Sequence, residues 1–190
     1  LPVDQVVTAD DYERTHANGR VAAVFACEGG DHLEGDPSHV EEAYADGVRH
    51  IQPFHVASNP LVEIGDDGRD AGLTGAGRDV VREMNRLGMV IDLGHASFTT
   101  ARAAAELSTA PIIQSHSLVR REGARGFGMT HDHARMIADT GGVIGAFGGA
   151  PNRDIPGFVD NILYMTEVVG VDHVGLGSDM DGTGGRSVWD

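Results

Sequence analysis

The sequence predicts an α/β fold, a (β/α)8 TIM barrel of which six of eight strands are present. Short apolar runs rich in Val and Ile alternate with helical patterns of about ten to fourteen residues, as is typical of parallel β/α units. No GxGxxG motif follows the first run, where "EGGDHLEGD" places a glutamate instead. A barrel is therefore favoured over a doubly wound nucleotide-binding sheet.

The predicted strands are the apolar runs. They cover residues 21–28, 47–54, 89–95, 111–116, 141–147 and 173–179. All are short, and the helical patterns between them provide the crossovers that parallel strands require.

The helices are predicted from apolar spacing and from capping residues. Residues 7–19 predict a helix that leads into the first strand. In the clearest case Thr74 is a plausible N-cap, Gly88 a stop, and the residues between them place an apolar stripe on one face, formed by Val80, Val81, Met84 and Leu87. Residues 97–108, 130–142 and 158–170 predict further helices, and residues 58–72 predict a polar, glycine-rich loop.

Composition excludes several functions. The net charge of −15, from 29 acidic and 14 basic residues, argues against binding nucleic acid or an anionic membrane. All basic residues are arginine, which excludes lysine Schiff bases, a P-loop lysine and a lysine-derived metal bridge within this chain. The single Cys27 cannot form an internal disulfide, and no apolar stretch approaches the roughly 18 residues of a membrane span. A cytoplasmic location is favoured.

Ionisable residues stand at five of the six strand ends. They are Glu28, His55, His95, His116 and Asp179. Each alone has a structural explanation, as a turn residue, a cap or a hydrogen-bonded histidine. In a barrel all carboxyl ends meet on one face, so we expect these five side chains to share one pocket. Imidazoles and carboxylates together suit zinc, and an uncoordinated aspartate beside the metal could move a proton to a leaving amine.

Several motifs resemble, in order and spacing, the membrane (renal) dipeptidase family of zinc peptidases, family M19. They are "EGGDHL", "GVRHIQPFHVASNPL", "GLTGAGRDVVREMNRLGMVIDLGHAS", "PIIQSHS" and "HVGLGSDMDG", and the resemblance runs from about residue 21 to the end. It implies a barrel of the metal-dependent hydrolase type that hydrolyses dipeptides through a metal-bridging hydroxide.

The resemblance also implies roles for the strand-end residues. Glu28 matches the glutamate that bridges two zinc ions, and His95 and His116 match the histidines of the second ion. His55 matches the histidine that binds substrate and polarises the oxyanion, and Asp179 matches the candidate acid/base. Asp181 is expected to support the structure. The expected partners are a dipeptide and, because family members are often dimers, a second copy of the chain.

The chain departs from the family pattern at its start. The family's first strand carries a His-x-Asp pair that holds the first zinc, and nothing before Val21 supplies it. We therefore expect residues 1–190 to be one partial barrel domain of a longer enzyme. Residues 1–20 would be a helix leading into the third barrel strand, residues 21–190 would hold six strands, and the first two strands and the C-terminal helices would be missing.

Other positions leave choices open. The family binds the substrate carboxylate with an arginine past the second zinc histidine; Arg120, Arg121 and Arg125 are candidates, of which we choose Arg125. Gly94 stands where the family often has serine, a change that we expect to be harmless. His131 and His133 have the HxH spacing of other barrel hydrolases, but they open a helix, so both are expected to face solvent.

Two other functions fit the same strand ends. One is a different metal-dependent barrel amidohydrolase that acts on a lactone, a cyclic amide or a phosphoester. The other is a non-catalytic barrel relic that binds at most one metal.

Overall fold

Six parallel strands lie side by side in chain order. The computed structural model describes residues 1–55, 59–64, 70–149, 152, 154–180, 182 and 187–188. One three-stranded sheet contains β3 (Phe25–Glu28), β4 (Val48–Gln52) and β7 (Val90–Ile91), and a second contains β8 (Ile113–Ser117), β9 (Val143–Phe147) and β10 (Val174–Gly177). Each of the six predicted runs thus overlaps a strand of these two sheets. The described residues do not form a closed barrel.

The two sheets meet between β7 and β8. Asp92 and Ile113 form an isolated parallel bridge, and the Leu93 amide donates to the Ile113 carbonyl at 2.8 Å. This short backbone connection continues the strand order from the first sheet into the second.

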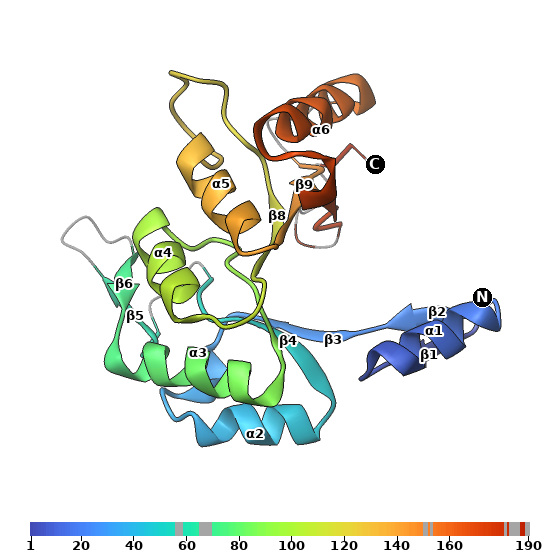
Figure 1. Ribbon diagram of the computed structural model, residues 1–190, viewed down its shortest axis with the longest axis vertical. Coiled ribbons are helices and arrows are strands. Elements are labelled where there is room, and N and C mark those ends of the chain that lie inside the picture. The colour runs from blue at the N-terminus through green and yellow to red at the C-terminus, as the bar shows by residue number, and fades with distance from the viewer. Residues whose placement is uncertain are drawn as a thin grey trace.

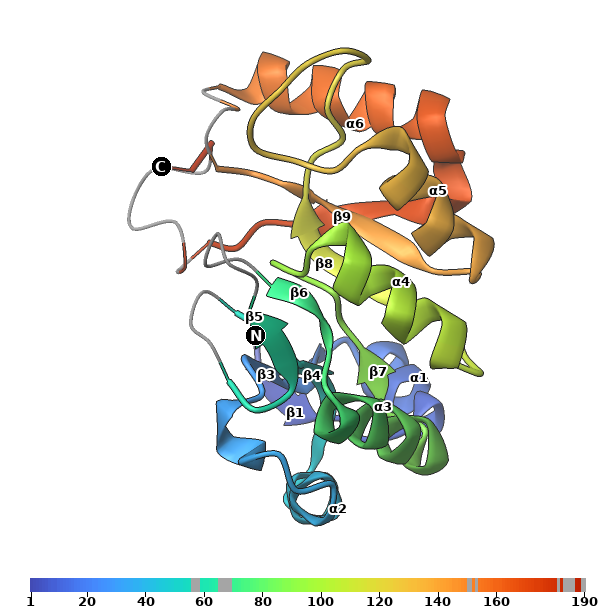
Figure 2. The same cartoon turned by 90° about the vertical axis from the view of Figure 1, so that its left-hand side faces the viewer.

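The helices form a layer along one side of the strands (Figure 2). They are α2 (Ser38–Ala45), α3 (Gly75–Leu87), α4 (Phe98–Leu107), α5 (His131–Asp139) and α6 (Ile155–Val169). Each packs against the next in chain order, as crossover helices of consecutive parallel strands do. No helix in the described part of the chain combines the length and apolar character needed to cross a bilayer.

Helix α3 begins and ends where its capping residues predict. The hydroxyl oxygen of Thr74 accepts from the Gly77 amide at 3.0 Å, and Gly88 has the left-handed φ of 71° that suits a C-terminal glycine. Ser97, Thr130 and Asp154 cap α4, α5 and α6 in the same way. Each N-cap fixes the point at which a loop from the carboxyl end of a strand turns into a helix.

The core lies between the strands and this helical layer. The strands contribute side chains that are at most 2% exposed, namely Ile51, Ile91 and Ile144. The helices contribute Met84 and Ile137, which are fully buried. Burying such a side chain contributes about 1.5–3 kcal/mol. The apolar face predicted for α3 is therefore the face that holds it against the sheet.

The N-terminal segment differs from the single helix expected over residues 1–20. A strand, β1 (Val3–Gln5), precedes α1 (Ala9–Ala17) and pairs in parallel with β2 (Val21–Ala23). Three residues are too few to give a periodic signal, so β1 escaped sequence analysis. These elements project from the remainder of the structure (Figure 1).

A hairpin occupies the region predicted as an irregular loop. β5 (Val62–Ile64) pairs antiparallel with β6 (Asp70–Leu73), while residues 65–69 between them lie outside the described part. Short 3-10 turns, η1 (Asp31–Leu33) and η2 (Val171–His173), complete the described elements.

Candidate metal centre

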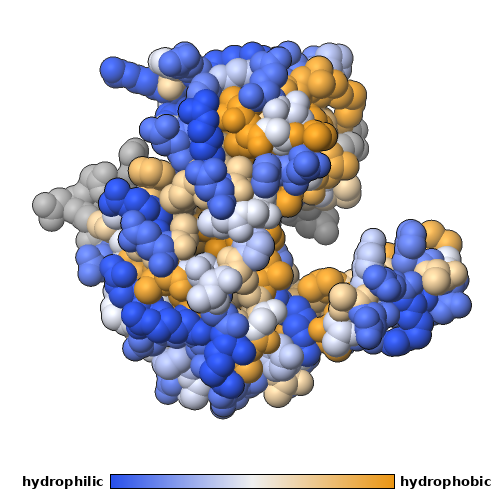
Figure 3. All heavy atoms as spheres, viewed as in Figure 1, coloured by the Kyte–Doolittle hydropathy of each residue, from blue (hydrophilic) through white to orange (hydrophobic). Residues whose placement is uncertain are grey.

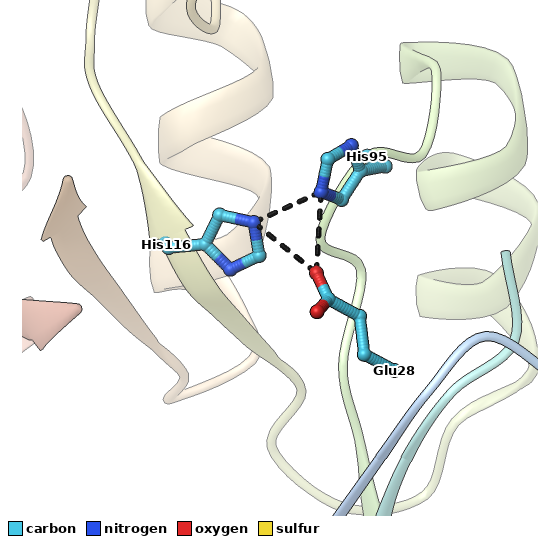
Figure 4. Close-up of side chains that lie close together, drawn as sticks. All are labelled: Glu28, His95 and His116. Carbon is cyan, nitrogen blue, oxygen red and sulfur yellow. Dashed lines mark hydrogen bonds and ion pairs between the residues drawn. The ribbon is translucent and has the colours of Figure 1, made fainter. Parts of the chain in front are cut away.

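Three potential metal ligands converge at the carboxyl ends of the strands. Glu28 is the last residue of β3, His116 lies in β8, and His95 lies between β7 and α4. Figure 4 shows the three side chains pointing toward one another. One carboxylate oxygen of Glu28, Oε1, lies 3.3 Å from Nε2 of His95 and 3.6 Å from Nε2 of His116. The two Nε2 atoms are 3.0 Å apart.

The chemistry of this donor set suits a divalent cation. All three donor atoms lie within 4.8 Å of one another, so one ion could contact each of them. Two imidazole nitrogens and a carboxylate oxygen are ligands that zinc accepts, and three protein ligands leave a position for substrate or water. The residues therefore fit a metal of this kind.

The backbone and a neighbouring hydroxyl orient the histidines. His95 has a left-handed φ of 61°, which turns the chain sharply after β7. On β8, Ser115 Oγ lies 2.9 Å from Nδ1 of His116. A partner on Nδ1 fixes the ring and leaves Nε2 directed at the cluster, as is usual for metal-binding histidines.

The environment of His95 favours its neutral form. Burial lowers the pKa of His95 below its ordinary value of 6.5, and the nearby His116 and His55 lower the pKa further, while Glu28 opposes the shift. Neutral imidazole is the form that binds metal, so this environment prepares His95 for coordination.

His55 borders the same cluster. Its Nε2 atom lies 3.7 Å from Oε1 of Glu28, and its ring meets the ring of His95 edge-on at 4.5 Å between centroids. The structure thus brings four of the five strand-end residues together.

A cavity of about 580 Å³ opens beside the cluster. The lining includes the two histidines of the cluster, the adjacent His55, three aromatic side chains and one arginine, namely His95, His116, His55, Phe54, Phe98, Phe127 and Arg120. Its wall combines apolar surface with several polar side chains, among them Gln114, Ser117 and Thr130, and small-molecule sites combine these two kinds of surface.

Asp179 lies two residues after β10, at the carboxyl end of the second sheet. It has a left-handed φ of 47°, and the described residues that line the cavity do not include it. The structure therefore places Asp179 on the expected face without a contact to the cluster in the described part of the chain. Asp181 lies outside the described residues.

The arginines separate by position. Arg120 lines the cavity beside the histidines, whereas Arg125 and Arg121 line a neighbouring cavity of about 270 Å³ that Arg120 also borders. Arg121 pairs with Asp160 at 2.6 Å and lies over the ring of Tyr164. The structure does not bring Arg125, our choice from sequence, into the cavity with the histidines.

The HxH pair behaves differently from expectation. His133 is only 6% exposed and lines the main cavity, so the prediction that it faces solvent is wrong. The reason is that α5 turns its apolar face inward, and His133 shares this face with Ala134 and Ile137. His131 contacts the hydroxyl of Tyr164 at 2.7 Å, away from Glu28.

Sequence analysis missed the buried polar residues behind the cluster. Asp92 is 2% exposed and contacts His50 of β4 at 2.9 Å, and Gln52 is 1% exposed. An aspartate just before a turn reads as an ordinary cap, so the only available signal was its position at the end of an apolar strand.

Parallel strands alternating with helices, with a carboxylate and two imidazoles at their carboxyl ends, define a candidate metal-dependent α/β enzyme. A family model for membrane dipeptidase, peptidase family M19, matches residues 2–188. The chain belongs to this family.

Two curated relatives of this chain are named as dipeptidases. The chain is 35% identical to an uncharacterized dipeptidase of Schizosaccharomyces pombe and 30% identical to the dipeptidase aclJ of Aspergillus oryzae, covering 90% and 88% of this chain. These matches cover 44% and 42% of the two relatives, so the chain spans less than half of their length.

Two solved structures have the same fold. An amidohydrolase from Pseudomonas aeruginosa superposes with a TM-score of 0.85 at 27% identity, covering 93% of this chain and 56% of that one. A metallo peptidase from Rhodobacter sphaeroides, liganded with a phosphinate mimic of the dipeptide L-Ala-D-Ala, gives 0.85 at 25% identity, with 95% and 56% covered.

Proposed function

We propose that the full-length protein is a zinc-dependent dipeptidase whose active site includes the cavity beside Glu28, His95 and His116. The observation that carries this proposal is the convergence of three donor atoms within 4.8 Å at the edge of that cavity. Family membership supports peptide hydrolysis, and the metallo peptidase with a bound dipeptide mimic supports a dipeptide as substrate.

Each residue has a proposed role. Glu28 would hold both zinc ions, and His95 and His116 would hold the second ion. Bound there, the ions supply Lewis acidity toward water and the amide carbonyl. His55 donates a hydrogen bond to the oxygen on which negative charge develops, and Asp179 transfers a proton to the leaving amine.

The cavity composition matches a dipeptide. Phe54, Phe98 and Phe127 offer apolar surface to side chains, and the guanidinium of Arg120 offers two donors to a terminal carboxylate. Arg125 remains the candidate chosen from sequence, but the cavity lining favours Arg120.

We further propose that the chain is a segment of a complete eight-stranded barrel. The His-x-Asp pair of the family is absent from this sequence. Apolar residues are exposed on both outer strands of the described sheets, with Phe25 of β3 at 49% and Leu176 of β10 at 73%. Additional strands that cover these residues would also supply the ligands of the first ion. A homodimer remains a prediction.

The test uses the full-length protein, loaded with zinc and assayed against dipeptides, lactones, cyclic amides and phosphoesters. We expect amide hydrolysis of dipeptides and two zinc ions per chain by elemental analysis. Turnover of only the other substrates would indicate a different amidohydrolase, and protein with no bound zinc would indicate a non-catalytic relic.

A further inference from the structure

Asp92 is a buried carboxylate with three hydrogen-bond donors around it. One oxygen, Oδ1, accepts from the amide of Gly94 at 2.9 Å and from the amide of Ser115 at 2.8 Å. The other, Oδ2, lies 2.9 Å from Nε2 of His50. Although burial raises the pKa of Asp92, the contacts with His50 and Ser115 outweigh it and hold the pKa below its ordinary value. The side chain is thus an acceptor at both oxygens.

Two of these bonds lead directly to the candidate ligands. Gly94 precedes His95, so the bond from its amide fixes the turn that gives His95 its left-handed φ of 61°. Ser115 precedes His116, and its hydroxyl contacts Nδ1 of that ring. One carboxylate oxygen therefore holds the backbone beside both histidines.

The strand pairing explains why this support is needed. The register between β8 and β9 shifts between Gln114 and Ser117, which is the stretch that carries His116. Asp92 also stands at the isolated bridge that links the two sheets in the described part of the chain. The Asp92 side chain, just after β7, thereby anchors the Ser115 amide on the edge of β8 that faces away from its irregular pairing with β9.

The third bond fixes the carboxylate itself. His50 lies on β4, the strand between β3 and β7, and donates to Oδ2 from its Nε2 atom. This bond holds the Asp92 carboxylate against β4. The orientation of the carboxylate therefore does not depend on the turn at Gly94 and His95, which the carboxylate supports.

We propose that Asp92 is a positioning residue of the candidate metal centre, which orients His95 and His116 together through the amides of Gly94 and Ser115. This inference rests on the proposed metal site for its functional meaning, but the orientation of the two rings does not require a bound ion.

The experiment compares Asp92→Asn and Asp92→Ala with the wild type in the full-length protein. Asparagine retains one oxygen for the two amides but replaces the other by an NH₂ group that faces His50; alanine removes all three bonds. We expect zinc affinity, measured by chelator competition, to fall about 10- to 100-fold in Asp92→Ala and less in Asp92→Asn. The cobalt-substituted protein should show an altered visible spectrum.

Thr140→Val is the matched control. Thr140 accepts from the Ile112 amide at 3.3 Å, so this variant loosens the opposite end of β8. We expect it to lower the melting temperature while zinc affinity and the cobalt spectrum stay unchanged. Equal losses of affinity in Thr140→Val and Asp92→Ala would reduce Asp92 to a purely structural residue and overturn the proposal.

A metal-free readout separates this inference from the proposed function. The ¹⁵N shifts of the imidazole rings in the metal-free protein report tautomer and hydrogen bonding, and Asp92→Ala should move those of His95 and His116. If the wild type binds no zinc but these shifts move, the metal site fails and the positioning role stands. Unchanged shifts in a folded Asp92→Ala variant contradict the role whether or not zinc binds.

Discussion

Nε2 of His95 faces Nε2 of His116 at 3.0 Å, and both nitrogens lie within 3.6 Å of the same Glu28 oxygen. One nitrogen must carry a proton if the two share a hydrogen bond, whereas a cation would accept both lone pairs and the carboxylate at once. The spacing of the three donor atoms therefore suits the coordination of one cation.

The first prediction concerns metal content. His116→Ala removes one of three ligands, and we expect zinc affinity to fall by at least 10-fold, because the remaining two donors hold the ion weakly. His131→Ala is the control, since His131 contacts Tyr164 instead of the cluster. Equal zinc content in the two variants after dialysis would argue against the site.

The second prediction concerns pH. The folded state lowers the pKa of His95, so below pH 6.5 the unfolded chain takes up a proton that the folded chain binds less readily. In the metal-free protein, the free energy of unfolding should therefore decrease as pH falls below 6.5, and it should level off once the folded-state pKa is passed. Urea titrations at several pH values measure this, and His95→Asn should weaken the dependence.

The third prediction concerns Gly94. A Cβ atom at this position would lie 2.1 Å from Oε1 of Gln52, which is 1% exposed. Overpacking of this kind costs about 1–3 kcal/mol, so Gly94→Ala should lower the free energy of unfolding by that amount. Gly75→Ala is the control, because a Cβ there meets nothing within 4 Å. The glycine that stands where the family often has serine thus has a steric reason in this structure, and our expectation that the change is harmless stays a prediction.

The fourth prediction concerns substrate binding. Arg120→Ala should raise KM for a dipeptide about 10- to 100-fold, because a charge-assisted hydrogen bond contributes about 1.5–3 kcal/mol. Arg121→Ala should leave KM unchanged, since its partners are Asp160 and Tyr164. A larger effect of Arg125→Ala than of Arg120→Ala would restore our choice from sequence.

The fifth prediction concerns proton transfer. Asp179→Asn preserves size and the left-handed backbone, which asparagine tolerates. We expect kcat to fall about 10²- to 10⁴-fold while zinc content stays the same. A loss of zinc in this variant would instead make Asp179 a ligand.

The site residues at strand ends were predictable from the sequence, whereas the residues positioned by loops were not. Glu28, His95 and His116 could be grouped because parallel strands share a carboxyl edge. The position of Arg120 depends on the bridge between Val119 and Met129, which folds residues 120–128 back on themselves, and spacing alone does not encode that bridge. Asp92 was missed because two of its three partners, the Ser115 amide and the His50 side chain, are distant in sequence and come together only in the fold.

The exposed apolar residues were likewise only partly predictable from the sequence. Figure 3 shows apolar residues interspersed with polar ones over the helices and strands of one face. The sequence identifies apolar positions well, but which of them remain uncovered depends on strand order. The exposed Leu176 of β10 is an example, since its strand is the outer one of its sheet.

The cluster takes Glu28 from one sheet and His116 from the other, across a seam where Asp92 and Ile113 form an isolated backbone bridge. A cation held there would act as a cross-link between the two halves, and its binding free energy would add to the stability of the folded chain. Zinc supply would then govern resistance to proteases and the lifetime of the protein in the cell, in addition to its chemistry.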